Sequence, residues 1–454
     1  MLKLAKALRL SRKSRLAFVG AGGKSSALFM AARQLDPPVL LTATTHLALA
    51  EAARADRWII AQSPQDIRRE DLGNAQVILY TRAEDGAGRT LGVSDATLEA
   101  IRRCADELKC PLLIEADGSR RLPLKAPAAY EPAIPVFCNE VVVVAGLSGL
   151  GKPLDHAFVH RPERFAELSG LSLGDVIGVE ALAQVLAHPL GGLKNIPPQA
   201  KRRLLLNQAD TPELQAQASL LAQMLSPHYA AIVVAQLEKH LDSDQSLTGG
   251  KQEGEVLAVH ERLAGIILAA GGSSRFGQPK LLLPWKGETI IRHVVRNALS
   301  AGLDPVVVVA GEQTPEIRRQ LADMDVILVL NPNWAEGQST SVQAGLQALG
   351  KDVGGAIFFL GDQPQIPPRL AQSLVEAHAL SLAPVIAPLV DGQRGNPVLF
   401  DRDTFEDLMS LRGDVGGRSL FSRYPIEWVP WHDPSVLLDI DTPEDYARLL
   451  ADIE

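Results

Sequence analysis

Cysteine and aromatic residues are scarce in this 454-residue sequence. The three cysteines, Cys104, Cys110 and Cys138, form no CxxC pair, which excludes a disulfide framework and a structural zinc site and predicts a reducing compartment. Aromatic residues make up only 5% and the net charge is -8, so no basic surface with stacking rings is expected for nucleic acid. No apolar run approaches the ~18–20 residues of a membrane span. We therefore expect a cytoplasmic protein that binds neither nucleic acid nor membrane.

The length and the apolar content indicate more than one domain. At about 100–200 residues per domain the chain has room for several, and 46% apolar residues are enough for separate cores. The segment from Leu241 to Glu255 is polar, contains glycines and has no periodicity, as expected between independently packed units. The sequence predicts a first domain at residues 1–240, a linker at 241–262 and a second domain at 263–454.

A glycine-rich segment follows a pronounced strand pattern in the second half. The apolar run from Leu263 to Ala270 is typical of a buried parallel strand, and it leads into LAAGGSSRFGQPK, which ends at Lys280. Gly271 and Gly272 allow positive φ and a close approach of backbone N–H groups to an anion. A plain glycine and serine turn is the alternative. The phosphate-binding interpretation predicts nucleotide contacts from Ala269, Ala270, Gly271, Gly272, Ser273, Arg275, Lys280 and Gly361.

A second motif, GDQP from Gly361 to Pro364, ends the apolar run AIFFL. Asp362 therefore lies at the carboxyl end of a strand, where open α/β sheets bind ligands. Magnesium is usually held by one or two carboxylates plus substrate phosphates, so a second acid from DIDTPEDY (Asp439 to Tyr446) would complete a site. That segment also fits helix capping, with Thr442 or Asp441 as N-cap before a proline. Both interpretations hold together.

These segments, with RGNP (Arg394 to Pro397) and GDVGGR (Gly413 to Arg418), resemble the motifs of the molybdenum cofactor cytidylyltransferase family. The resemblance spans Leu263 to Glu454, and the LAAG start of the glycine segment is the cytidylyl-like form. It implies a Rossmann-like nucleotidyltransferase domain with a mostly parallel sheet. The implied catalytic residues are Arg275, Lys280 and Asp362, and the implied metal ligands are Asp362 and Asp441, with Asp439 as the alternative to Asp441.

The same resemblance implies Mg²⁺-dependent transfer of CMP from CTP to molybdopterin. A terminal phosphate on the acceptor would attack the α-phosphate and expel pyrophosphate, so positioning and charge neutralisation matter more than a protein nucleophile. No side-chain base is required, because the second pKa of a phosphate monoester is about 6. A sugar or polyol phosphate is the alternative acceptor.

Apolar runs alternate with helical patterns through the second half, which predicts a doubly wound α/β sheet. The runs lie at 305–310, 326–330, 356–360 and 384–389. Between them, Ser339 is the expected N-cap of a helix with a buried stripe of Val342, Ala344, Leu346 and Leu349. This segment also resembles the piece of the same family in which Gly337, Ser339 and Ser341 open a helix close to the nucleotide or pterin. Helix capping explains the same residues equally well.

The first half carries another phosphate-binding pattern. The segment from Arg15 to Leu35, RLAFVGAGGKSSALFMAARQL, is typical of a strand, a glycine turn, Lys-Ser and an amphipathic helix, the layout of a P-loop. The first glycine of GxxxxGK[ST] would fall at Phe18, so the loop is shorter or differently shaped. A structural turn is the alternative. The predicted nucleotide contacts are Gly20, Gly22, Gly23, Lys24 and Ser25.

Two more strand ends in the first half carry polar residues. LLIEADGS ends a strand in Glu115 and Asp117, and Asp117 is the candidate Mg²⁺ ligand. LLLNQAD resembles the NKxD base-reading motif of GTPases and adds Asn207 and Asp210 to the predicted nucleotide contacts. Gln208 stands where lysine is usual, so the motif does not establish guanine.

A third glycine pattern, from Gly146 to Lys152, matches GxxxxGK but is followed by Pro153. Proline supplies no hydroxyl for Mg²⁺ and no N–H for phosphate. We expect a sharp turn there.

The first-half motifs, with GLSGLGKPL and VHRPE, together resemble the YqeC family, accessory proteins of selenium-dependent molybdenum hydroxylases. Because the activity of that family is itself unsettled, the resemblance implies a pathway more than a reaction. Fusion of this P-loop-like α/β domain to a cytidylyltransferase points to maturation of molybdenum hydroxylases, with molybdenum cofactor as a ligand and an apo hydroxylase as a candidate partner. An NTP-gated delivery factor for the cofactor is the alternative to an enzyme.

Overall fold

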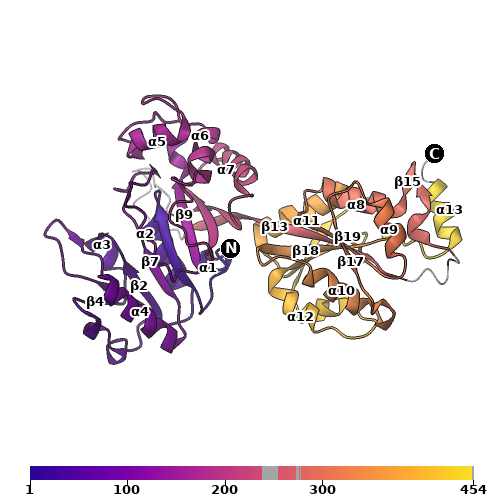
Figure 1. Ribbon diagram of the computed structural model, residues 1–454, viewed down its shortest axis with the longest axis horizontal. Coiled ribbons are helices and arrows are strands. Elements are labelled where there is room, and N and C mark those ends of the chain that lie inside the picture. The colour runs from indigo at the N-terminus through magenta and orange to yellow at the C-terminus, as the bar shows by residue number, and fades with distance from the viewer. Residues whose placement is uncertain (238–253, 272–275, 277, 452–454) are drawn as a thin grey trace. The chain divides into compact units, whose positions relative to one another are not determined.

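The computed structural model describes residues 1–237, 254–271, 276 and 278–451. The chain forms two compact units, Met1–His260 and Glu261–Glu454 (Figure 1). Most of the expected linker at 241–262 lies outside the described residues. Its last part is not a linker, because residues 255–262 belong to strand β13 (Glu255–Ala269). Both units are α/β, which confirms the predicted fold class.

The first unit is built on a parallel sheet. Its strand order is β4-β5-β2-β7-β1-β9-β11-β12, and every neighbouring pair is parallel. The strands are β1 (Arg15–Gly20), β2 (Val39–Ala43), β4 (Arg57–Ile60), β5 (Val77–Thr81), β7 (Leu112–Glu115), β9 (Glu140–Gly146), β11 (Lys201–Asn207) and β12 (Ala231–Gln236). Because parallel strands end at one edge, the polar residues after β1, β7 and β11 share that edge.

Helices cover the sheet of the first unit. They are α2 (Lys24–Arg33), α4 (Asp95–Leu108), α5 (Pro162–Ser169), α6 (Val179–Ala187) and α7 (Pro212–Leu225). Apolar residues of α4 to α7 form one buried cluster with residues of the sheet, whereas α2 contacts β1 and β7 with buried residues outside that cluster. The helix at α2 starts directly after the glycine loop, as the strand–turn–helix pattern predicts.

The second unit has a mixed sheet in the order β17-β16-β13-β18-β21-β19-β22. The strands from β17 to β18 are parallel, β21 is antiparallel to both of its neighbours, and β20 pairs with β19 as a short antiparallel strand. Beyond β13, the strands are β16 (Val306–Ala310), β17 (Ile327–Leu330), β18 (Val353–Leu360), β19 (Val385–Val390), β20 (Gln393–Arg394), β21 (Val398–Asp401) and β22 (Ile426–Pro430). All four predicted apolar runs are strands.

Helices pack on both faces of this second sheet. In Figure 1, α8 (Ile290–Ser300) and α11 (Pro368–Ser381) lie on one face, and α10 (Gln338–Gln347) and α12 (Phe405–Met409) lie on the other. Two separate apolar clusters correspond to these faces. The remaining helices are α9 (Thr314–Gln320) and α13 (Pro443–Ala451). No helix in the described ranges is long and apolar enough to cross a membrane.

The start of α10 differs from the prediction. Gly337, not Ser339, is the N-cap, and Ser339 is buried inside the first turn. Gly337 has φ 116, and a Cβ there would lie 2.4 Å from the backbone of Gly413, so close packing of two loops decides where the helix begins. Val342 and Leu346 are buried as predicted.

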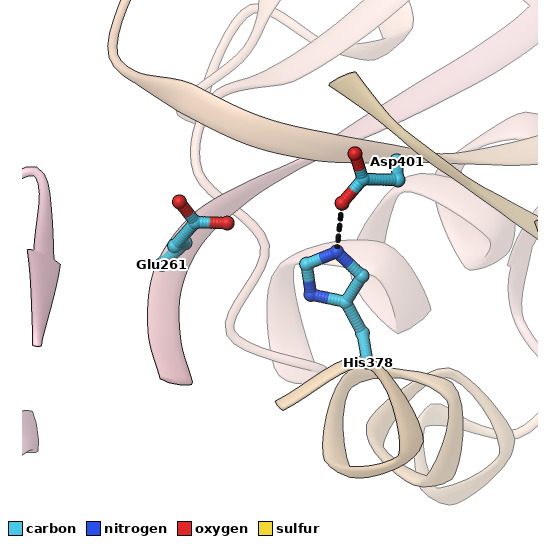
Figure 2. Close-up of side chains that lie close together, drawn as sticks. All are labelled: Glu261, His378 and Asp401. Carbon is cyan, nitrogen blue, oxygen red and sulfur yellow. Dashed lines mark hydrogen bonds and ion pairs between the residues drawn. The ribbon is translucent and has the colours of Figure 1, made fainter. Parts of the chain in front are cut away.

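Three polar side chains from different elements of the second unit lie close together, two of them buried and Glu261 half-buried (Figure 2). His378 lies in the last turn of α11, Asp401 ends β21, and Glu261 opens the unit. The His378 Nε2 and Asp401 Oδ2 atoms are 2.8 Å apart, and both side chains are 1% exposed. Because Asp401 pairs with Gly355 near the start of β18, this cluster lies at the edge opposite the strand's carboxyl end. The contact ties α11 to the sheet.

We expect the His378–Asp401 contact to contribute to stability. Exchange of either residue for alanine removes this hydrogen bond from the buried partner that remains. We expect the free energy of unfolding to fall by about 1–3 kcal/mol. Urea unfolding of both single variants and the double variant gives the coupling directly, with coupling of about 0.5–3 kcal/mol expected for contacting residues. Glu376→Ala, an exposed position on the same helix, is the control. Additive single effects would contradict the assignment.

Candidate functional site

The carboxyl ends of β13 and β18 lie side by side and form the floor of a cavity in the second unit. Leu268 is paired with Leu360, and the Gly361 N–H donates to the Leu268 carbonyl at 3.0 Å. A Cβ at Gly361 would lie 3.0 Å from that same oxygen, so the turn after β18 favours glycine. Asp362 follows at the cavity wall. The cavity is about 490 Å³, and its lining includes Ala269, Ala270, Gly271, Lys280 and Asp362.

Lys280 occupies the centre of a carboxylate cluster. Its Nζ lies 2.5 Å from Asp362 Oδ2 and 3.3 Å from Asp441 Oδ1, and it also donates to the Ile440 carbonyl at 2.9 Å. Partial burial acts to lower the pKa of Lys280, but the charges and hydrogen bonds of the two aspartates outweigh burial and raise it. The Lys280 ammonium group thus occupies a position between the Asp362 and Asp441 carboxylates, where a positive charge is favoured.

Asp439 and Asp441 have different environments. Asp439 Oδ1 accepts from Gln363 Nε2 at 2.6 Å, whereas Asp441 Oδ1 lies 3.3 Å from Lys280 Nζ. Surrounding protein desolvates the Asp439 carboxylate and raises its pKa, and the negative charges of Asp362 and Asp441 act in the same direction. Of the two, Asp441 is the one that shares a cation with Asp362.

The helix-capping interpretation of this segment also holds. Asp445 Oδ2 accepts from the Thr442 N–H at 2.9 Å, and the Asp445 N–H donates to Thr442 Oγ1 at 3.2 Å. Pro443 is the first residue of α13. The reciprocal bonds are those of a capping box at Thr442, and they fix the backbone that carries Asp441.

Three of the predicted nucleotide contacts, Gly272, Ser273 and Arg275, lie outside the described residues. The cavity is also lined by the segment 334–338, by Ser341 and by Asp414 of the GDVGGR segment. Gly337 and Ser341 are two of the three residues that the sequence offered as ligand contacts at the start of α10. Asp414 Oδ1 accepts from the Gln338 N–H at 3.3 Å, which joins the start of α10 to the GDVGGR segment. Only the fold brings these two segments together.

A second cavity of about 220 Å³ adjoins the first. Both are lined by Leu268, Gln338 and Leu360. The second cavity adds an apolar wall that includes Phe358 and Phe400, together with the polar groups of Asn396, Arg418 and Asp439. Apolar walls with a few placed polar groups are typical of small-molecule sites.

In the first unit, the glycine loop is forced by close backbone contacts. Gly20, Gly22 and Gly23 all have positive φ. A Cβ at Gly20 would lie 2.2 Å from the Val144 carbonyl oxygen, and one at Gly23 would lie 2.4 Å from Asn207 Nδ2. The loop therefore packs against the ends of β9 and β11. Helix α2 begins at Lys24, and its N-cap, Gly23, has no side chain that could accept a hydrogen bond from the first turn.

Lys24 and Ser25 both meet the acids after β7. Lys24 Nζ is 3.4 Å from Asp117 Oδ1 and donates to the Gly20 carbonyl at 2.8 Å, while Ser25 Oγ donates to Glu115 Oε2 at 2.8 Å. Burial raises the pKa of Glu115 to about 7, against the lowering effects of Lys24 and Ser25. Glu115 was not among the predicted ligands, although it precedes Asp117 in the same motif.

Asp117 is the predicted metal ligand of the first unit, but its carboxylate is already engaged. It accepts from the Gly20 N–H at 3.0 and 3.1 Å and from Lys125 Nζ at 2.7 Å. Lys125 also pairs with Glu131 at 2.9 Å, and Glu131 pairs in turn with Arg161. These contacts show that Asp117 holds the loop, and its role as a Mg²⁺ ligand stays a prediction. Sequence spacing gave no signal for the Lys125–Glu131–Arg161 network.

Asn207 and Asp210 are placed differently. Asn207 Nδ2 donates to the Gly22 carbonyl at 2.7 Å, and its Oδ1 accepts from the Leu237 N–H at 3.0 Å. Asp210 Oδ1 is buried without a hydrogen-bond partner within the described ranges. Asn207 thus braces the loop, whereas no hydrogen bond among the described residues joins Asp210 to it. The third glycine pattern, which starts at Gly146, forms a 3₁₀ turn over Leu147–Gly149, in agreement with the sharp turn expected there.

Comparison with known families agrees with this division. The family model described as MobA-like NTP transferase domain matches residues 265–428, and the model described as YqeC protein matches residues 16–163. The chain is 32% identical over 236 residues to the uncharacterized protein YqeC of Escherichia coli (strain K12), covering 50% of this chain and 90% of that protein.

Two further relatives match the second unit. The molybdenum cofactor cytidylyltransferase of Escherichia coli (strain K12) is 29% identical, covering 40% of this chain and 92% of that protein. The purine catabolism protein PucB of Bacillus subtilis (strain 168) is 32% identical, covering 40% and 94%. Both resemblances drawn from the motifs are confirmed. The chain belongs to the YqeC family through its first unit and carries a MobA-like NTP transferase domain in its second, which makes it a nucleotidyltransferase.

Proposed function

We propose that the second unit transfers CMP from CTP to molybdopterin and releases pyrophosphate. The observation that carries this proposal is the Lys280 ammonium held between Asp362 and Asp441 at the cavity. The relative named molybdenum cofactor cytidylyltransferase supports the acceptor and the nucleotide. The cavity beside Lys280 would take the nucleotide, and the adjoining cavity with Asn396 and Arg418 would take the acceptor.

In this reaction, a terminal phosphate oxygen of the acceptor forms the new bond to the α-phosphorus of CTP. The bond from that phosphorus to the pyrophosphate oxygen breaks, and pyrophosphate leaves with the electron pair. Backbone N–H groups after β13 and the Lys280 ammonium would neutralise charge on the leaving group. No protein nucleophile is needed.

Magnesium fits the donor set at this site. Asp362 and Asp441 offer carboxylate oxygens to a shared cation, which is the ligand type that Mg²⁺ prefers. When bound with the nucleotide, the ion would neutralise phosphate charge. Lys280 would then turn from the carboxylates to the phosphates, so the resting contacts keep the lysine and the acids close to their working positions.

The first unit is proposed as an NTP-binding accessory domain for maturation of molybdenum hydroxylases. Three glycines with positive φ, a helix start without a side-chain cap and buried Lys24 support a phosphate site at Gly20 to Ser25. Ser25 and Glu115 are the residues suited to a nucleotide-bound cation. Transfer to a sugar phosphate, or cofactor delivery without transfer, remain the competing functions.

Asp362→Asn tests the transferase site. We expect pyrophosphate release from CTP with molybdopterin to fall by about 10²–10³-fold, because a charge-stabilising group of the transition state is lost. Asp325→Asn, at an exposed surface position, is the matched control and should retain wild-type rates. Undiminished release by Asp362→Asn would remove this residue from the site.

The Mg²⁺ dependence of transfer distinguishes Asp441 from Asp439 as the metal ligand. Asp441→Asn should raise the Mg²⁺ concentration for half-maximal transfer by about tenfold or more, because it loses a ligand facing the cation position. Asp439→Asn keeps a group that can accept from Gln363 and should stay close to wild type. The assignment fails if the two variants exchange these behaviours in an Mg²⁺ titration of the initial rate.

Lys24→Ala tests the first unit in the full chain. Loss of a charged contact to phosphate should weaken NTP binding by about 10- to 100-fold, while cytidylyl transfer by the second unit stays unchanged. Isothermal titration with ATP and GTP gives the binding, and Lys152→Ala, at an exposed lysine of the same unit, is the control. If Lys24→Ala binds both nucleotides as the wild type does, VGAGGKSS is only a turn.

A further inference from the structure

Two consecutive arginines occupy an unfavourable turn directly after the acids of β7. Arg120 has φ 52 and Arg121 has φ 61, and the Leu122 N–H donates to the Ser119 carbonyl at 3.1 Å across them. Positive φ at both central residues is the pattern of a type I′ turn, where glycine, asparagine and aspartate dominate. Arginine in this conformation is disfavoured and persists where the surroundings impose it.

The surroundings that impose this turn are the phosphate loop itself. The Gly22 N–H donates to the Leu122 carbonyl at 3.0 Å, and Lys24 Nζ donates to Ser119 Oγ at 3.1 Å. Behind the turn, Lys125 Nζ donates to the Gly118 carbonyl at 2.6 Å. Both ends of the arginine turn are therefore fixed to residues of the loop or to residues that hold it.

The charges of the two arginines are left available. Both side chains are exposed, and the described part of the chain offers them no ion pair or side-chain hydrogen bond. Nearby Arg161, in contrast, is neutralised by two hydrogen bonds to Glu131 at 2.7 and 3.1 Å. Burial, together with the positive charges of Arg161, Lys125 and Arg120, lowers the pKa of His160 to about 4. The field beside the loop is thus positive.

We propose that the Arg120–Arg121 turn is a terminal-phosphate site, through which the first unit binds a nucleoside triphosphate in preference to the diphosphate. This inference rests on the proposed NTP binding at Gly20 to Ser25. The Gly20 and Gly22 N–H groups already donate to Asp117 and to the Leu122 carbonyl. The N–H groups at the start of α2 and the Lys24 ammonium would therefore hold the inner phosphates, and the guanidinium groups would meet the additional phosphate. Planar guanidinium groups match phosphate oxygens in paired hydrogen bonds, which are stronger than bonds between neutral groups.

The turn also supplies a way to remove the charge without unfolding the loop. Glycine adopts positive φ freely, so Arg120→Gly with Arg121→Gly should keep or raise thermal stability. Arg9→Gly is the matched control, because Arg9 is also left-handed, with φ 51, and precedes the loop on another element. A double lysine variant retains charge but not the planar fork, and it should recover only part of the preference.

The experiment is a titration of the full chain with ATP, ADP, GTP and GDP in the presence of Mg²⁺. The component of binding that Lys24→Ala removes defines the first-unit site. Within this component we expect the double glycine variant to lose about tenfold or more of the triphosphate preference, with diphosphate affinity nearly unchanged. Arg9→Gly should keep the wild-type preference.

Two negative results are distinguishable. If Lys24-dependent binding exists and the double glycine variant keeps its triphosphate preference, the arginine turn is overturned while the phosphate loop stands. If no nucleotide shows Lys24-dependent binding, the proposed function of the first unit fails together with this inference. Thermal unfolding of every variant shows that a lost preference reflects the site and not the fold.

Discussion

Parallel strand pairing is the constraint on which both candidate sites depend. The carboxyl ends of neighbouring parallel strands lie at one edge of the sheet, so strand pairing brings together residues that are far apart in sequence. In the second unit, the register of Leu268 with Leu360 brings the end of β13 to the cavity that Asp362 also lines. In the first, pairing of Phe18 with Glu115 brings Lys24 and Ser25 to the acids after β7. Each unit thus sets a lysine that follows a glycine loop against a carboxylate that follows the neighbouring strand.

The same arrangement has an electrostatic consequence. Charged groups taken out of water are costly unless they are paired, and the lysine–aspartate contacts supply that pairing. Lys24 is 3% exposed beside Asp117, and Lys280 is 15% exposed beside Asp362. A phosphate-bearing ligand with a bound cation could replace these contacts: the phosphate would pair with the lysine, and the cation with the aspartate. Binding can therefore exchange one set of ion pairs for another instead of opening an unpaired buried charge.

Strand ends and loop motifs were readable from the sequence, because a buried strand and its polar terminus are local features. Asp362 and the glycine segment were found in this way. Contacts between residues on different strands or loops could not be predicted in this way, because they depend on strand register and packing. The sequence offered Asp439 and Asp441 as near equals, and only the fold puts Asp441 against Lys280 and Asp439 against Gln363. Lys125 and Glu131 carry no motif, and their link to Asp117 arises from packing. Ser339 had the right chemistry for an N-cap, yet close approach of Gly413 moved the cap to Gly337.

The most direct test of the account is the identity of the product made by the full chain from molybdopterin and CTP with Mg²⁺. Mass spectrometry should find molybdopterin carrying one added CMP, with pyrophosphate released in equal amount, and CTP should be preferred over GTP and ATP. Pyrophosphate release that requires a sugar phosphate instead of molybdopterin would contradict the proposed acceptor. Tight nucleotide binding without any transferred CMP would contradict cytidylyl transfer to molybdopterin and leave a delivery factor as the better description.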